Sequence, residues 1–263
     1  MPEGDTVFAT ARRLTEALAG VTLVRGELRH PRLSTVDLAG RELVRAHSVG
    51  KHLFLRFDRE LSLHCHLGMD GSWGIYDQSR RAPVNHRTRA ILGTAGTVAL
   101  GQSLHEMALV STSDEPRLVA HLGPDLLSPQ WSDDLAAAAA RRLTADPARE
   151  LGLALLDQRV MAGVGNVYKA ELCFLLGVSP WTQVSAVAAA DTVSLARKLL
   201  LHNALRPIRN TTGDPRRGRE LWVYGRRTCL RCGGRVVVTR QGAGLRERAA
   251  YYCPHCQPGP GPT

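Results

Sequence analysis

The chain has 263 residues, 44% of them hydrophobic, and 34 Lys and Arg against 24 Asp and Glu give it a formal net charge of +10. A chain of this length can bury a core without disulfide support. No apolar run reaches membrane-spanning length and no secretory signal precedes the first element, so we expect a cytoplasmic protein. The positive charge favours a polyanion as partner, although it also fits a merely soluble basic protein.

The first predicted element is a helix that follows MPEGDT and ends at Gly20. Asp5 is expected to cap this helix. Met1 precedes a small residue and is expected to be removed, which would leave Pro2 as a free secondary amine. The plainer interpretation is that proline is simply tolerated near a helix start. The apolar residues at helical spacing are Val7, Phe8, Ala11, Leu14, Ala17 and Leu18.

Short alternating or apolar runs fill residues 22–110 and are separated by Gly, Pro and Asp, which predicts an antiparallel sandwich or barrel. Lys51 lies between two of these runs, in SVGKHL, and is one of only three lysines in the chain. The plainer interpretation is a lysine on a surface turn. The segment HLGPDLLSPQW, residues 121–131, contains Gly and Pro and is predicted to be a linker.

An all-helical stretch follows, and within it the loop AGVGN joins two helices at Asn166. Small loop residues and the exposed N–H groups of a new helix are suited to binding an anion. An ordinary helical hairpin capped by Asn166 explains the same residues. The predicted helices cover residues 134–143, 148–160, 167–178 and 186–205.

Four cysteines near the C-terminus form two C-x2-C pairs, the spacing of a structural zinc site with no open position. Disulfides are the alternative, and a cytoplasmic location disfavours them. Residues 206–248 contain twelve arginines against three acids, an excess suited to phosphate contacts rather than to a solvated charged face alone. Two strands, 234–241 and 248–253, and a disordered tail QPGPGPT are predicted here. The zinc ligands are Cys229, Cys232, Cys253 and Cys256.

Taken together, these motifs resemble the Fpg/Nei family of DNA glycosylases, on its endonuclease VIII (Nei) side and of the actinobacterial type. The resemblance rests on MPEGDTV, GKHLFLRF, HLGMDGSW, HLGPDLL, LLDQRVMAGVGNVYKAE, LWVYGR and RAAYYCPHCQ, in that order. It implies an α+β multidomain fold in which an N-terminal helix and antiparallel β-sandwich, residues 1–125, form the catalytic domain. A helix–two-turn–helix domain, residues 126–215, and a zinc-ribbon hairpin with its tail, residues 216–263, would follow.

The resemblance also implies roles for individual residues. Pro2 would be the nucleophile, Glu3 the adjacent acid/base, and Lys51 a phosphate or sugar contact with a part in proton transfer. Asn166, beside Gly165, and Arg248 would hold the phosphates that flank the lesion.

Two further positions carry open alternatives. Met69 would fill the gap left by the extruded base, and the alternative is a core methionine. Glu171 matches an acidic position near the family's active site, and the alternative is a structural cap or an ion pair.

The implied activity is that of a bifunctional DNA glycosylase and AP lyase of base excision repair. It would excise oxidised pyrimidines from duplex DNA through a Schiff base on Pro2 and cut the strand by β,δ-elimination. The partner is damaged double-stranded DNA, and the protein is expected to be a nucleoid-associated monomer with one structural Zn2+ and no membrane contact. The rival functions are an Fpg-like oxidised-purine glycosylase and a non-catalytic zinc-ribbon DNA-binding protein.

Overall fold

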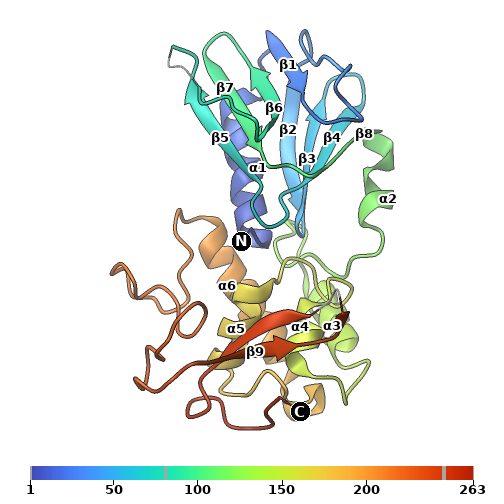
Figure 1. Cartoon of the computed structure of the whole chain (residues 1–263). Coiled ribbons are helices and arrows are strands. Elements are labelled where there is room, and N and C mark those ends of the chain that lie inside the picture. Colours follow the sequence, from blue (N-terminus) through green and yellow to red (C-terminus); the bar gives the residue numbers. More distant parts are fainter. Residues whose placement is uncertain (1, 80–81, 245–246, 263) are drawn as a thin grey trace. The chain divides into compact units, whose positions relative to one another are not determined.

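The computed structural model describes residues 2–79, 82–244 and 247–262, which form two compact units, residues 1–121 and 122–263 (Figure 1). Each unit has its own core. None of the helices in these described ranges has both the length and the apolar character needed to cross a membrane.

The first unit opens with α1, Gly4–Leu18, which buries an apolar face that includes Val7 and Leu14. The predicted cap is wrong: Glu3, not Asp5, is the N-cap residue, and its extended backbone makes no side-chain capping bond. Asp5 lies inside the first turn, where a negative charge still complements the helix dipole. The chain then leaves the helix through Gly20, whose φ of +75° favours glycine.

Two four-stranded antiparallel sheets complete this unit, in the orders β1-β6-β7-β5 and β2-β3-β4-β8, which confirms a sandwich rather than a barrel. Apolar residues of both sheets and of α1 share one core, for example Leu14, Leu55 and Leu92. The strands are β1 Arg25–Leu28, β2 Leu43–Val49, β3 His52–Phe57, β4 Leu61–His66, β5 Ser72–Asp77, β6 Thr88–Gly93, β7 Thr97–Gln102 and β8 Glu106–Ser111. A short η1, Thr112–Asp114, and α2, Glu115–Val119, follow β8.

The second unit is helical at its start, with α3 Asp133–Leu143, α4 Leu151–Leu156, α5 Asn166–Leu175, η2 Val184–Ala186 and α6 Ala189–Ala204. The side chain of Ser132 caps α3 by accepting from Leu135 N. The helix predicted over 148–160 is too long, because α4 ends at Leu156. Asp157 then takes an extended backbone, and its carboxylate accepts the N–H of Arg159.

The segment predicted as a linker is partly built into this unit. Gly123 N donates to Gln158 O, and Ala162 N donates to Pro124 O. A Cβ on Gly123 would lie 2.5 Å from the carbonyl oxygen of Val160, so only glycine fits this approach.

Residues 205–236 are irregular and lead into the predicted pair of strands, an antiparallel hairpin of β9, Val237–Gln241, and β10, Arg248–Tyr252. The C-terminal segment that was predicted to be disordered makes contacts with the helical unit at two of its residues. Gln257 is buried and its Nε2 donates to Val178 O, while the Ser179 hydroxyl donates to Pro260 O. These hydrogen bonds attach the Gly/Pro-rich segment to the residues that follow α5.

Candidate functional site

The N-terminal residues of interest lie directly before α1. Pro2 is half-buried, and Glu3 is fully buried at the start of the helix. The carbonyl of Glu3 accepts from Val7 N, which begins the helical ladder. A carboxyl group is therefore held next to the residue predicted to supply a secondary amine.

Lys51 lies on the tight turn between β2 and β3. Val49 pairs with His52, which leaves Gly50 and Lys51 as the two turn residues, and Gly50 has a φ of +57°. A left-handed glycine in the first central position matches the twist of a two-residue hairpin. The backbone of Lys51 is thus held at the tip of a hairpin. A side chain at such a tip can extend toward a ligand.

Met69 follows β4 and is 71% exposed. This exposure excludes the alternative of a core methionine. An exposed apolar side chain on a loop is available to contact a partner.

The Gln158 side chain organises the turn that leads into α5. Gln158 donates from Nε2 to the carbonyls of Leu156 and Val164, and its Oε1 accepts Gly163 N at 3.0 Å. Gly165 is the N-cap residue, and α5 begins at Asn166 as predicted. The turn is therefore a braced structure with a helix N-terminus at its end.

Asn166 is buried in its first turn, with 7% of its surface exposed. Its Oδ1 has no hydrogen-bond partner within the described parts of the chain. In a residue that serves only as a helix cap, a buried amide oxygen usually accepts a hydrogen bond. This favours a ligand contact over the ordinary cap.

Glu171, one turn further along α5, is fully buried. Oε2 accepts from the Thr211 hydroxyl and from Trp222 N at 2.8 Å, and Oε1 accepts from Val223 N at 3.0 Å and Tyr224 N at 2.9 Å. The carboxylate therefore takes four protein donors and anchors both ends of the intervening loop. These contacts favour the structural alternative for Glu171 over direct contact with DNA.

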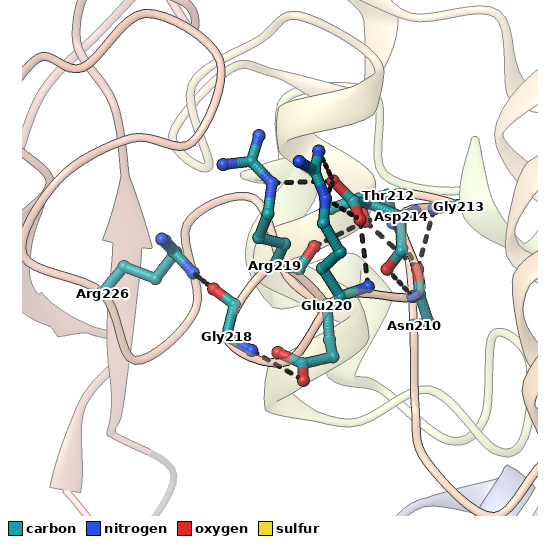
Figure 2. Close-up of polar contacts among 9 residues, drawn as sticks. Asn210, Thr212, Gly213, Asp214, Gly218, Arg219, Glu220 and Arg226 are labelled. Carbon is teal, nitrogen blue, oxygen red and sulfur yellow. Dashed lines mark hydrogen bonds and ion pairs between the residues drawn. The ribbon is translucent and has the colours of Figure 1, made fainter.

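The loop so anchored has a polar framework of its own (Figure 2). Asn210 Oδ1 accepts from Thr212 N and Gly213 N, in an Asx-type turn, and the carboxylate of Asp214 accepts from the guanidinium of Arg219 at 2.7 Å. Arg226 Nη1 donates to Gly218 O at 2.6 Å. This loop was not predicted from the sequence, although the run NTTGDP contains the turn residues that signal it.

The hairpin beyond the loop is joined to α5. Lys169 is fully buried, and its Nζ donates to the carbonyl of Ala249 at 3.2 Å, next to Arg248 on β10. Arg248 itself is exposed. The strand that carries this arginine is thereby held against the helix that carries Asn166.

Four cysteine sulfurs gather where the hairpin starts and ends. Their Sγ atoms all lie within 4.8 Å of one another, with 3.9 Å between Cys229 and Cys256 and 3.6 Å between Cys232 and Cys253. A tetrahedron with Zn–S bonds of about 2.3 Å has edges of ~3.8 Å, so this set of donors fits a metal ion. The N–H of Gly234 lowers the pKa of Cys232 to about 7, whereas burial raises the pKa of Cys253 and of Cys256.

The predicted site residues thus divide between the units. The first unit contains Pro2, Glu3, Lys51 and Met69, and the second contains Gly165, Asn166, Glu171, Arg248 and the four cysteines. A nucleophile candidate with a neighbouring carboxyl group belongs to one unit. A helix–turn–helix with a basic hairpin and a cluster of four cysteines belongs to the other.

Comparison with known families gives matches in both units. Residues 1–105 match the formamidopyrimidine-DNA glycosylase N-terminal domain, and residues 122–212 match the H2TH domain of the same enzymes. The chain belongs to the formamidopyrimidine-DNA glycosylase family. The first match covers α1 and the strands β1 to β7, and the second covers the helices α3 to α6.

Several relatives of high sequence identity come from actinobacteria. A probable endonuclease 8 2 of Streptomyces coelicolor is 52% identical over 100% of this chain and 96% of its own length. The DNA-(apurinic or apyrimidinic site) lyase Nei2 of Mycolicibacterium smegmatis is 48% identical, with 98% and 99% covered. Formamidopyrimidine-DNA glycosylases are more distant, for example the 30% identical protein of Nocardioides sp.. The chain therefore lies on the endonuclease 8 side of the family, as predicted.

Solved structures support the fold. Lactococcus lactis formamidopyrimidine-DNA glycosylase bound to DNA with an AP site has a TM-score of 0.79 to this chain at 20% identity, covering 98% of this chain and 100% of the other. Another complex of that enzyme, with DNA that contains an oxidised pyrimidine, has a TM-score of 0.77. A place in base excision repair is consistent with the names of these relatives.

Proposed function

We propose that the protein is a bifunctional DNA glycosylase and AP lyase that excises oxidised pyrimidines, such as thymine glycol or 5-hydroxycytosine, from duplex DNA. The observation that carries the proposal is the placement of Pro2 and the buried Glu3 at the start of α1, in a chain that is 48% identical to an AP lyase. We choose pyrimidine over purine lesions because the chain resembles the endonuclease 8 side of the family.

In the proposed reaction the neutral Pro2 nitrogen attacks C1′ of the damaged nucleotide. The bond from C1′ to the base breaks, and its electron pair and a proton leave with the base. Glu3 protonates the sugar ring oxygen as the ring opens, which leaves an iminium ion between C1′ and Pro2. Loss of the C2′ proton expels the 3′ phosphate, a second elimination expels the 5′ phosphate, and water releases Pro2. No oxidant or reductant is consumed.

The remaining residues are proposed to hold the DNA. Lys51 at its hairpin tip would contact phosphate or sugar, and the exposed Met69 would occupy the space of the extruded base. Asn166, beside Gly165, and Arg248 would hold the flanking phosphates, with the Asn166 Nδ2 group and the Arg248 guanidinium as hydrogen-bond donors. Glu171 would act through the loop that it anchors rather than by touching DNA.

We also propose that the four cysteines hold one structural Zn2+. Four sulfurs at tetrahedral spacing leave no open position, so the ion would stabilise the hairpin and take no part in the reaction. Two hydrophobic residues of α5, Ala170 and Phe174, pack with Cys229 and Cys253 in one cluster, so the metal site is continuous with the helical core.

Trapping with borohydride tests the proposed function. Reduction of the iminium ion should give a stable cross-link between Pro2 and lesion-containing DNA, located by peptide mass spectrometry. A prior mass measurement of the intact protein should show that Met1 is absent, because Pro2 within an amide cannot attack. An absence of cross-linked protein in the wild type would overturn the mechanism.

The choice of lesion is tested by comparing excision rates on duplexes with thymine glycol and with 8-oxoguanine under the same conditions. We expect faster release of thymine glycol. A clear preference for 8-oxoguanine would instead support the Fpg-like function, while leaving the trapping result unchanged.

Replacing Cys229 with Ser should release zinc and weaken DNA binding, because three thiolates and a hydroxyl no longer close the tetrahedron and the hairpin loses its anchor. Bound metal is measured by atomic absorption and affinity by fluorescence anisotropy with duplex DNA. The matched control is Cys173→Ser, a buried cysteine outside the cluster, which should keep the metal. Full zinc content and full affinity in the Cys229 variant would contradict the proposed site.

A further inference from the structure

A row of imidazole rings lies on β3 and β4 next to the Lys51 turn. Leu53 and Leu63 point into the core, so the alternate residues of these strands occupy the opposite face of the sheet. There His52, the residue after Lys51, stacks on His64 with 5.1 Å between ring centroids. The stack continues through Phe54, 4.8 Å from His64.

His52 and His64 are also hydrogen-bonded, with 2.9 Å between His52 Nδ1 and His64 Nε2. Such a bond needs one nitrogen that donates and one neutral nitrogen that accepts, so it cannot form when both rings are charged. His66, the cross-strand partner of His52, meets the His52 ring edge-on at 5.5 Å. His66 Nδ1 accepts the N–H of Gly68, which precedes Met69.

The surroundings keep these rings neutral. Burial, together with the nearby His64, His66 and His121, lowers the pKa of His52 to about 4, and burial also lowers the pKa of His64 and of His66. At neutral pH the hydrogen bond is therefore intact. The charged or titratable groups that face the cluster are Arg45, His47 and Lys51 from β2 and its turn, Arg56 from β3, Glu106 from β8, Glu115 from α2, and His121.

We propose that His52 and His64 are positioning residues for Lys51. Their hydrogen bond and stacked rings tie the first residue of β3 to β4, and so fix the two-residue turn on which Lys51 is carried. Because a displacement of about 1 Å in a contacting group can cost up to 100-fold in rate, a bond of this kind affects the reaction without touching DNA. The inference rests on the proposed function, and within it on the role of Lys51.

A double-mutant cycle tests the inference. His52→Phe keeps a stacked ring but removes the nitrogen, and Lys51→Ala removes the positioned group. We expect His52→Phe to slow single-turnover cleavage of a preformed abasic site about tenfold at neutral pH, with DNA affinity within a factor of two. In the Lys51→Ala background the same change should cost nothing more, because the two residues act as one unit.

Two further variants test whether the His52–His64 hydrogen bond itself is responsible for the loss of rate. His52→Asn places an oxygen near the position of Nδ1, can accept from His64 Nε2, and should restore most of the rate. His47→Phe removes an equally buried imidazole from the same face, one that lies on β2, stacks on Phe54 and pairs with Glu115 rather than with His52, and should leave the rate unchanged. If His52→Phe does not fold, His64→Leu, which deletes the other half of the bond, should give the same tenfold loss.

The outcomes separate the inference from the function. A wild-type rate in His52→Phe, or an equal further loss in the Lys51→Ala background, overturns the positioning role while Pro2 trapping still supports the function. Full activity in Lys51→Ala overturns the role of the lysine and the inference with it. Failure of trapping in the wild type overturns the proposed function itself.

Discussion

Replacement of Glu3 with Gln should abolish base excision and leave part of the cleavage of preformed abasic sites. The side chain is fully buried at the start of α1, so the substitution keeps its shape while removing the proton that the sugar ring oxygen needs. Loss of a general acid costs typically 100- to 10,000-fold in rate. A preformed abasic site is an open aldehyde for part of the time, so its attack by Pro2 depends less on ring protonation.

The measurement is single-turnover kinetics on two matched duplexes, one with thymine glycol and one with an abasic site. Glu16→Gln is the control, because Glu16 lies on the same helix, is exposed and pairs only at the surface with Arg12. It should leave both rates within a factor of two. Wild-type excision by the Glu3 variant would remove this residue from its proposed role.

Glu171→Gln should destabilise the second unit by about 3 kcal/mol, the magnitude expected when buried hydrogen bonds to a charge are lost. Each carboxylate oxygen of Glu171 accepts from two donors, so either orientation of an amide turns its NH2 group toward two N–H or O–H groups. Chemical unfolding measures the loss. Hydrogen exchange should also show faster exchange at Trp222, Val223 and Tyr224, whose amide protons lose their acceptor.

Glu220→Gln is the matched control, since Glu220 belongs to the same loop and accepts from Gly218 N near the surface. Its effect should stay within about 0.5 kcal/mol. If Glu171→Gln unfolds like the wild type and the three amides stay protected, the carboxylate does not anchor the loop. Its role would then have to be sought in direct contact with DNA.

The sequence predicted those features that depend on local pattern. The heptad-like spacing after Asp5 predicted α1, the alternating runs predicted the sandwich, and the cysteine spacing predicted a cluster that the structure brings within 4.8 Å. The start of α5 at Asn166 was also predicted, because two glycines before it end any helical run. Each of these signals is a pattern in the order of residues and needs no knowledge of which distant segments pack together.

Long-range contacts explain what was missed. Asp5 looks like an N-cap in the sequence, but the N-cap is Glu3, two residues earlier, and the helix begins at Gly4. The role of Glu171 depends on donors some forty to fifty positions away, and the bond between His52 and His64 forms only when β3 pairs with β4. The alternation H-x-H in LHCHL was a visible signal for two imidazoles on one face.

The packed tail has a consequence for how the protein is truncated. Gln257 Oε1 accepts the backbone N–H of Cys253, and its Nε2 reaches Val178 O after α5, so one amide side chain clamps a cysteine knuckle to the helical body. A gene shortened after Cys256 would keep every thiol and yet lose that clamp. Removing this glycine- and proline-rich end, for example to aid crystallisation, would therefore also remove a contact that holds the cysteine cluster in place.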